Sequence, residues 1–383
     1  MIDIVLKIDP EIVMGMDIIN RVGTICKTYG NQFLLISEKR LNDDKSIERL
    51  KAILQDSGVQ TILFDEIKAP VMADIAENIA HLARAAHCSG IIGFGSPSVQ
   101  AIARLSAIIA ADMSDVFEFL DGKIPTTGLP YIAIPSVKED PFLTAESFIV
   151  EDPRDREIRL IHTPRGLCKA VVIDGAFSGI MSVDGGYTPV YAAAFDGFCM
   201  AVEAYCSKKA NILSDAVLEK AIALFAQIIS SSVNGGVNMK ELDVQAALLV
   251  NIGSAVSAPG VGSTLARAIA DRFPVEKSLC SAALLPAILD KLVSCRAEKI
   301  AAVALLMGEK TEGLPDAEAA LLPAASIRSS LEKLAISPRL RDLGLQLDRL
   351  IPITESARNL DIVAFSPWTV TTEEILNIIK QSF

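Results

Sequence analysis

Histidine is scarce in this sequence. The 383 residues contain three histidines, His81, His87 and His162, and all of them lie in the first half of the chain. A histidine-rich metal site therefore cannot be assembled from the second half. The seven cysteines are an odd number and form no C-x-x-C pair, which argues against a disulfide framework and against a zinc knuckle. We expect the cysteines to be buried free thiols.

Positive charge is also in short supply. Lysine and arginine total 36 against 47 aspartates and glutamates, which gives a formal net charge of −11. An acidic surface repels phosphate backbones and anionic lipid head groups, so we expect neither nucleic acid nor a membrane as a partner. The chain starts with Asp3, Lys7 and Asp9 where a secretory signal needs an unbroken apolar run, and this predicts a cytoplasmic location.

Long apolar stretches without polar interruption are missing as well. The longest uncharged stretch, residues 244–266, could span a bilayer by length but contains glutamine, asparagine, serine, proline and glycine. We expect it to be a buried helix. Hydrophobic residues make up 51% of the chain, and this content together with its length favours two folded domains.

The first half alternates short apolar runs with amphipathic segments. Strands are predicted at residues 32–37, 61–65, 90–95 and 129–135, and residues 46–57 repeat apolar side chains at helical spacing. This alternation is typical of a parallel sheet with crossover helices. We therefore predict an N-terminal α/β domain with a Rossmann-like parallel sheet.

The pattern changes beyond residue 145. A few short strand-like runs follow, the last at residues 170–174, and after Tyr191 almost every segment is rich in alanine and leucine with helical periodicity. The second half is therefore predicted to be all-α. We place the boundary near residue 165, which gives an α/β domain of residues 1–165 and a helical domain of residues 166–383.

A glycine turn between a buried strand and a helix is the strongest local signal. Gly93 and Gly95 permit backbone conformations that other residues resist, Ser96 is a good N-cap, and Pro97 suits the first helical position. Amides at such a helix start can bind a phosphate, although many turns of this kind bind nothing. Glu38 follows an earlier strand, where its carboxylate either accepts hydrogen bonds from an adenosine ribose or is solvated.

A second candidate region is the alanine- and phenylalanine-rich segment around Asp196. Asp196, Met200 and Glu203 recur there at helical spacing. A carboxylate inside such a stretch is unusual unless it is paired. This segment is therefore the second candidate for a functional site.

Six sequence blocks, in order, resemble the iron-containing alcohol dehydrogenases, which share the dehydroquinate synthase-like fold. The blocks are IIGFGSPS, LPYIAIPS, AVVIDGAF, FDGFCMAVEAYCSKKANILSDA, SAALLPAIL and TTEEILNIIKQSF. The resemblance covers nearly the whole length. It implies a dinucleotide-binding N-terminal domain, a helical metal- and substrate-binding domain, NAD(P) as cofactor, a small-molecule ligand in the interdomain cleft, and a homo-oligomer, most simply a dimer.

The family's first motif reads G-G-G-S-x-x-D-x-x-K, with its glycines facing the dinucleotide pyrophosphate. Phe94 replaces the middle glycine here, and we expect its ring to fill the pyrophosphate space and to weaken cofactor binding. The next motif of the family, I-P-T-T-x-G-T-G-S-E, keeps Ile134 and Pro135 but loses both glycines and the hydroxyls after Ser136. The positions that the resemblance assigns to NAD(P) are Glu38, Gly93, Gly95, Ser96 and Ser136.

The family holds its metal ion with an aspartate and three histidines. The resemblance places Asp196 at the aspartate position and Met200, Ser263 and Lys277 at the histidine positions. A carboxylate, a thioether and a hydroxyl are a poor donor set for iron or zinc, so we expect no metal ion there. We expect the Lys277 ammonium within salt-bridge or single-water distance of the Asp196 carboxylate, and these two residues are the catalytic candidates.

Two functions follow from these expectations. In the first, the protein is an NAD(P)-dependent oxidoreductase acting on an alcohol or a carbonyl, and Lys277 polarises the carbonyl in place of the metal. In the second, the protein is a binding or assembly protein of the same fold without catalysis, and Lys277 only neutralises Asp196.

Overall fold

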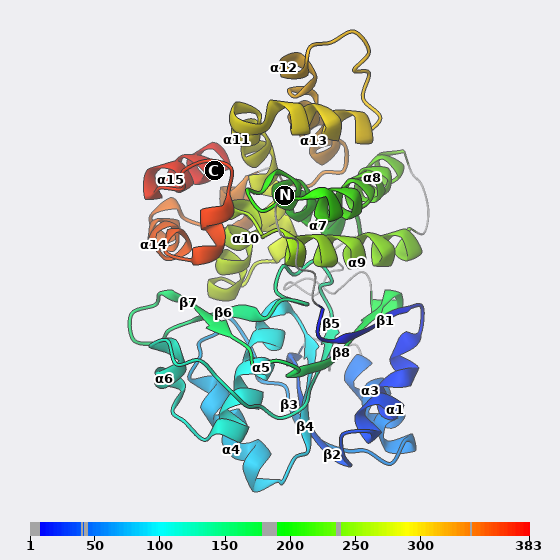
Figure 1. Ribbon diagram of the computed structural model, residues 1–383, viewed down its shortest axis with the longest axis vertical. Helices are drawn as coiled ribbons and strands as arrows, with labels where there is room; N and C mark the ends of the chain where they lie inside the picture. The colour runs from blue at the N-terminus through cyan, green and yellow to red at the C-terminus, as the bar shows by residue number, and fades with distance from the viewer. Residues whose placement is uncertain (1–7, 40, 42–44, 178–189, 235–238, 338) are drawn as a thin grey trace. The chain divides into compact units, whose positions relative to one another are not determined.

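The computed structural model describes residues 8–39, 41, 45–177, 190–234, 239–337 and 339–383 (Figure 1). The chain divides into two compact units, Ile8–Met181 and, in the main, Ser182–Phe383, and each is described here by itself. The first unit extends beyond the boundary expected at residue 165. The reason is that the strand-like run at residues 170–174 pairs inside the sheet, so the predicted boundary was too early.

Six parallel strands form the sheet of the first unit. In spatial order they are β1 (Glu11–Gly15), β8 (Cys168–Asp174), β5 (Tyr131–Pro135), β4 (Gly90–Gly95), β2 (Gln32–Ile36) and β3 (Gln60–Phe64). The parallel sheet is as predicted, and the four predicted strands are confirmed to within two residues. β1 escaped prediction because only its central residue, Val13, is buried. A separate antiparallel pair joins β6 (Ser147–Glu151) to β7 (Ile158–His162).

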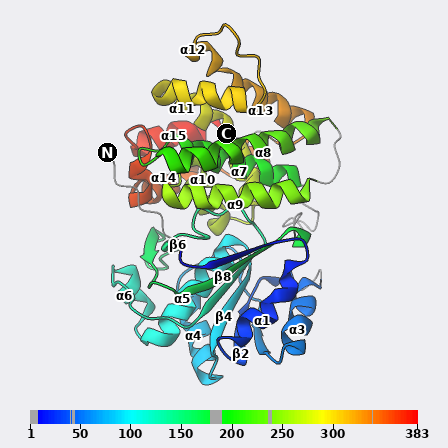
Figure 2. The same cartoon turned by 45° about the vertical axis from the view of Figure 1, so that its right-hand side comes forward.

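Helices cover both faces of this sheet (Figure 2). One face carries η1 (Ile18–Arg21), α1 (Val22–Lys27) and α3 (Ser46–Asp56), and the other carries α4 (Ile75–Ala85) and α5 (Pro97–Asp112). The short helices α6 (Val116–Leu120) and η2 (Gly175–Phe177) complete the unit. Because successive side chains of a strand point to opposite faces, each strand supplies one row of core residues to each layer of helices.

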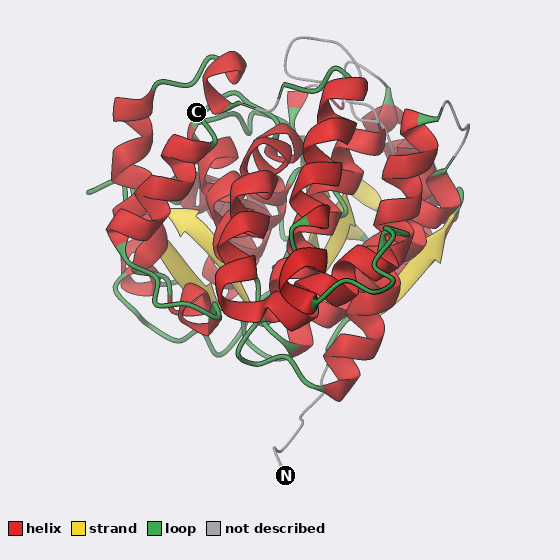
Figure 3. Ribbon diagram, turned by 90° about the horizontal axis from the view of Figure 1, so that it is seen from above, coloured by secondary structure: helices red, strands yellow, loops and turns green. Residues whose placement is uncertain are grey.

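In the described part of the second unit, every regular element is a helix (Figure 3). The helices are α7 (Val190–Cys206), α8 (Ile212–Val233), α9 (Lys240–Val256), α10 (Val261–Arg272), α11 (Lys277–Leu306), α12 (Asp316–Ala319), α13 (Leu322–Lys333), η3 (Leu340–Leu343), α14 (Leu347–Arg358), η4 (Asp361–Phe365) and α15 (Thr372–Gln381). α7 packs against α8, α9, α10 and α11, and is the central helix of the unit. The prediction of a helical second domain is confirmed.

The long uncharged stretch is two helices and not the single buried helix we expected. α9 and α10 meet at an angle of 109°. The break contains Pro259, which lacks an N–H and disfavours a helical conformation in the residue before it. In the described residues one helix, α11, is long and apolar enough to cross a membrane, but 67% of its most apolar window is buried inside the protein, as in a core helix.

Candidate functional site

The glycine turn after β4 leads directly into α5. Ser96 is the N-cap residue with an extended backbone, and Pro97 begins the helix, as the sequence predicts. The Ser96 side chain makes no capping hydrogen bond. Instead the Ser96 amide donates to Glu38 Oε1 at 3.1 Å, so the carboxylate that follows β2 lies at the start of α5. The structure therefore brings together two of the positions assigned to the cofactor.

The Phe94 ring does not enter this turn, which corrects our expectation. Phe94 is fully buried in the core between the sheet and α1 and α3, in one cluster with Phe33, Leu35 and Ile134. Strand alternation is the reason: Ile92 and Phe94 point to one face of β4, and the intervening glycine faces the other. The aromatic ring replaces a glycine in the motif without occupying the space beside the turn.

Gly93 is required by packing of α5 on the sheet. A β-carbon at this position would lie 2.9 Å from Gln100 Oε1 and 3.0 Å from the Ala103 β-carbon. One at Gly95 would lie 2.9 Å from Val99 Cγ2. Both glycines thus allow the helix to approach the strand end closely, which places the first amides of α5 next to the strand.

Ser136 lies at the end of β5, beside the turn. Its amide donates to the Gly95 carbonyl at 2.9 Å, which joins the ends of β4 and β5. Its side chain is 1% exposed, and no described group hydrogen-bonds to its hydroxyl oxygen. A buried hydroxyl without a partner is costly, so Ser136 Oγ is suited to a ligand that supplies a hydrogen bond.

The second candidate region is built around an ion pair. Lys277, the first residue of α11, places Nζ 2.6 Å from Asp196 Oδ1 and 2.5 Å from Asp196 Oδ2 on α7. Ser281, one turn further along α11, donates its hydroxyl to Oδ1 at 2.6 Å. The side chains of Lys277 and Asp196 are 3% and 0% exposed. The predicted salt bridge is confirmed. Ser281 was not among the predicted site residues, although its spacing of four residues from Lys277 places both side chains on one face of a helix.

Ser263 is engaged elsewhere. Its amide and its hydroxyl both donate to Glu203 Oε2 at 2.9 Å, and the Gly262 amide donates to Glu203 Oε1 at 2.6 Å. Glu203 on α7 therefore binds the amino-terminal end of α10 with its carboxylate, a favourable place for negative charge. Burial raises the pKa of Glu203, while these hydrogen bonds act in the opposite direction.

The neighbouring cysteines offer no thiolate. Burial raises the pKa of Cys199 well above its ordinary value, and Glu203 and Asp196 raise it further. Burial also raises the pKa of Cys280. Both side chains therefore remain thiols, which are weak ligands compared with thiolates.

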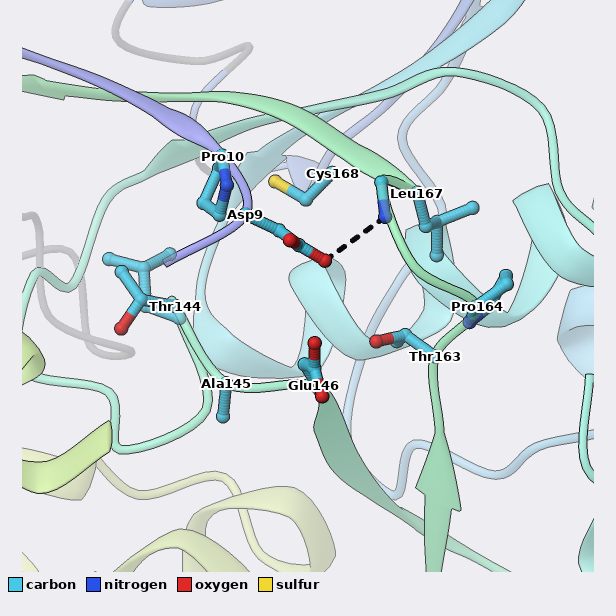
Figure 4. Close-up of a pocket in the computed structure, with 11 residues that line it drawn as sticks. Asp9, Pro10, Thr144, Ala145, Glu146, Thr163, Pro164, Leu167 and Cys168 are labelled. Atoms are coloured by element: carbon cyan, nitrogen blue, oxygen red, sulfur yellow. Dashed lines mark hydrogen bonds between the residues drawn. The ribbon is translucent and has the colours of Figure 1, made fainter. Parts of the chain in front are cut away.

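A small cavity in the first unit is a separate feature (Figure 4). It lies between the loops around Thr144 and Pro164, and the Asp9 carboxylate on its wall accepts a hydrogen bond from the Gly166 amide at 3.1 Å. Its volume is about 20 Å³. That is room for about one water molecule, so neither a nucleotide nor an organic substrate fits there.

Two family models match this chain. The model described as iron-containing alcohol dehydrogenase matches residues 9–175, and the model of the C-terminal region of the same family matches residues 190–383. The chain belongs to the iron-containing alcohol dehydrogenase family. It is thus a member of a family of oxidoreductases, as the six sequence blocks indicated.

Relatives and solved structures of this dehydrogenase family agree with the assignment. The 1,3-propanediol dehydrogenase of Citrobacter freundii is 26% identical over 96% of both chains, and the NAD-dependent methanol dehydrogenase of Bacillus methanolicus is 19% identical over 98% of both. The crystal structure of a 1,3-propanediol oxidoreductase has the same fold, with a TM-score of 0.87, 22% identity and complete coverage of both chains.

The described residues do not fit the iron ion of this dehydrogenase family. Both Asp196 oxygens bind the Lys277 ammonium, Met200 is a buried thioether, and Ser263 donates to Glu203. In the described part of the chain, no group of three or more histidine, cysteine, aspartate or glutamate side chains is arranged to hold a metal. The Lys277 ammonium, a cation, already lies against the Asp196 carboxylate.

Proposed function

We propose that this chain is an NAD(P)-dependent oxidoreductase that interconverts a small alcohol and its carbonyl compound without a metal ion. The observation that carries the proposal is the Lys277–Asp196 pair, with both Nζ–O distances between 2.5 and 2.6 Å. It occupies two positions that the family resemblance assigns to metal ligands. In this proposal the ammonium supplies the positive charge that the family obtains from iron.

The substrate class is proposed from the relatives. Two of them are named for 1,3-propanediol and methanol, which are short alcohols. The methanol dehydrogenase is also named as NAD-dependent. These names support a short alcohol or aldehyde and a nicotinamide nucleotide for this chain.

The turn after β4 has groups that fit a dinucleotide. The Ser96 amide at the start of α5 suits a phosphate oxygen, the unpaired Ser136 hydroxyl suits a second polar contact, and the Phe94 ring leaves the turn open. Glu38 suits a ribose hydroxyl, and in this role its carboxylate leaves the Ser96 amide. When bound, the nicotinamide supplies or accepts a hydride.

Lys277 has a defined role in this chemistry. Reduction of a carbonyl places negative charge on the carbonyl oxygen, and an adjacent ammonium lowers the energy of that charge. Lys277 then donates a proton to the oxygen and regains one from water, so one hydride and one proton are consumed for each alcohol formed. Asp196 holds the amine in place, and the Ser281 hydroxyl donates a hydrogen bond to the Asp196 carboxylate.

The experiment uses the purified full-length protein after treatment with a chelator. Oxidation of NADH and of NADPH is followed with a panel of short aldehydes, before and after addition of iron or zinc. We expect turnover that the chelator does not abolish and that Lys277→Met reduces by at least about 100-fold, the scale of a lost charge-stabilising group. The matched control is Lys291→Met, which removes a lysine from the same helix. Lys291 pairs with Glu374 at a partly exposed position, and this variant should retain activity.

A non-catalytic binding protein is the second candidate. It is favoured by the burial of Lys277, which is 4% exposed and fully compensated by Asp196. Absence of turnover with both nucleotides, with or without added metal, would support this candidate and reject the first. Turnover that appears only with iron would reject the role of Lys277.

A further inference from the structure

One buried amide joins the ends of β4 and β5. Gln100 on α5 is 2% exposed, and its Nε2 lies 3.1 Å from each of three carbonyl oxygens, those of Gly93, Gly95 and Ile134. Its Oε1 accepts a hydrogen bond from the Tyr131 hydroxyl. A single side chain therefore contacts both strand ends from which the candidate cofactor contacts follow.

The orientation of this amide is fixed by its surroundings. Carbonyl oxygens only accept, so the side that faces the three carbonyls must be the NH₂ group. Burial raises the pKa of Tyr131, which keeps its hydroxyl protonated and available as a donor to the amide oxygen. All polar atoms of the Gln100 side chain are thus satisfied in one arrangement.

The same face of α5 holds the segment that follows β5. Arg104 lies four residues after Gln100 and so on the same side of the helix. Its guanidinium donates to the Leu143 carbonyl at 2.6 Å and lies 5.6 Å from the centre of the Tyr131 ring. Two polar side chains of one helix therefore fix the loop geometry on both sides of the strand end.

We infer that Gln100 is a positioning residue for dinucleotide binding: it sets the spacing of the Gly95–Ser96 turn and Ser136, which an apolar side chain of equal size would leave free to shift. This inference rests on the proposed function and goes beyond it, because it assigns part of the dinucleotide affinity to Gln100, a residue that does not contact the dinucleotide. The hydrogen bond from the Ser136 amide to the Gly95 carbonyl and the parallel pairing of β4 with β5 join the same two segments through the backbone.

The test measures dinucleotide affinity and local opening in three variants of the full-length protein. Gln100→Met keeps the volume and removes the amide, and Tyr131→Phe removes only the hydroxyl that orients it. Ser106→Ala is the matched control, since Ser106 is buried in the same helix and its hydroxyl has no described hydrogen-bond partner. NADH and NADPH are titrated calorimetrically at a temperature well below every melting midpoint.

We expect Gln100→Met to weaken nucleotide binding by about tenfold or more and Tyr131→Phe by about threefold, as lost hydrogen bonds of ordinary strength would. Ser106→Ala should change affinity by less than about twofold. Amide hydrogen exchange in residues 93–98 and 134–138 should accelerate in Gln100→Met and, less strongly, in Tyr131→Phe. A purely structural role would lower the melting temperature without changing affinity or exchange at these two segments.

The outcomes separate this inference from the proposed function. If the wild-type protein binds neither nucleotide, the proposed function fails, and the inference that rests on it fails with it. If the wild type binds and both variants bind equally well with unchanged exchange, the inference is wrong and the proposed function stands. Should Gln100→Met fail to fold, Tyr131→Phe decides the question by the same two measurements.

Discussion

The turn after β4 and the ion pair on α7 both depart from the family motifs, but the departures have different consequences. In the turn, the ring of Phe94 is directed into the core and so does not occupy the space beside the turn. In the helical unit, the lysine at a ligand position lies directly against Asp196. A changed motif residue therefore alters the site only when its side chain points toward the site.

The two regions also place carboxylates differently at helix starts. Glu203 is buried, and its two oxygens accept three hydrogen bonds at the start of α10. Glu38 is half-buried, and the Ser96 amide donates to it at the start of α5. The first arrangement lies in the core, and the second lies nearer the surface, where a charge-assisted hydrogen bond contributes less to stability.

The largest effect that we expect comes from breaking the buried pair. Lys277→Met should lower the free energy of unfolding by about 3–5 kcal/mol, because Asp196 would remain buried without its partner. Lys291→Met should cost less than about 1 kcal/mol, because the side chains of Lys291 and Glu374 are 24% and 38% exposed. Chemical denaturation of both variants measures the difference. Equal stability would show that the pair contributes no more than a surface contact.

An intermediate effect should distinguish the two carboxylates. Glu203→Gln should lower the free energy of unfolding by about 1.5–3 kcal/mol near neutral pH. The reason is that the glutamine side chain has one hydrogen-bond acceptor fewer for the amino-terminal end of α10. Glu38→Gln should cost less than about 1 kcal/mol. Thermal unfolding of both variants and the wild type checks whether Glu203→Gln is the more destabilising of the two substitutions. The reverse order would mean that the start of α5 depends on Glu38 for its stability.

The pH dependence at Glu203 follows from the direction of its pKa shift. Because burial raises the pKa, the folded protein binds this proton more tightly than the unfolded chain does. The contribution of Glu203 to stability is therefore greatest below the unfolded pKa of about 4.3 and declines as pH rises through the raised value. The difference in free energy of unfolding between the wild type and Glu203→Gln should therefore become smaller as pH rises from the unfolded pKa to the raised folded pKa. A difference in free energy of unfolding that increases with pH would contradict a raised pKa of Glu203.

The smallest effect tests the assignment of Phe94 to the core. Phe94→Leu should lower the free energy of unfolding by about 1–2 kcal/mol, because it removes part of a fully buried ring from the core. Nucleotide affinity should stay within about twofold, because the ring lies on the face of β4 away from the turn. Titration of NADH into this variant checks the expectation. Markedly tighter binding would restore the original hypothesis that the ring obstructs the pyrophosphate.

Much of the fold could be predicted because the sequence signals are local and periodic. The strands β2, β4 and β5 are buried on both faces and appear as continuous apolar runs. β1 lacks such a run, since only Val13 is buried and Glu11 and Met14 are exposed, and β1 was therefore not predicted. The domain boundary was misplaced because β8 joins the sheet through pairing with distant strands, which no local pattern shows.

The candidate site was predictable only in part. The Lys277–Asp196 contact could be predicted because the family resemblance placed both residues around one ion. The partner of Ser263 could not, because Glu203 lies on another helix 60 residues away in sequence. The direction of Phe94 was available from strand alternation, but the motif comparison considered the residue type without the face of the strand.

The lysine at Asp196 makes the positive charge part of the polypeptide. A bound ferrous ion dissociates with dilution, is removed by chelators and changes its oxidation state. The Lys277 ammonium is synthesised with the chain, is present once in every molecule, and has no redox chemistry under biological conditions. The positive charge that lies against Asp196 is therefore a covalent part of the chain, present from synthesis and retained through dilution and oxidation.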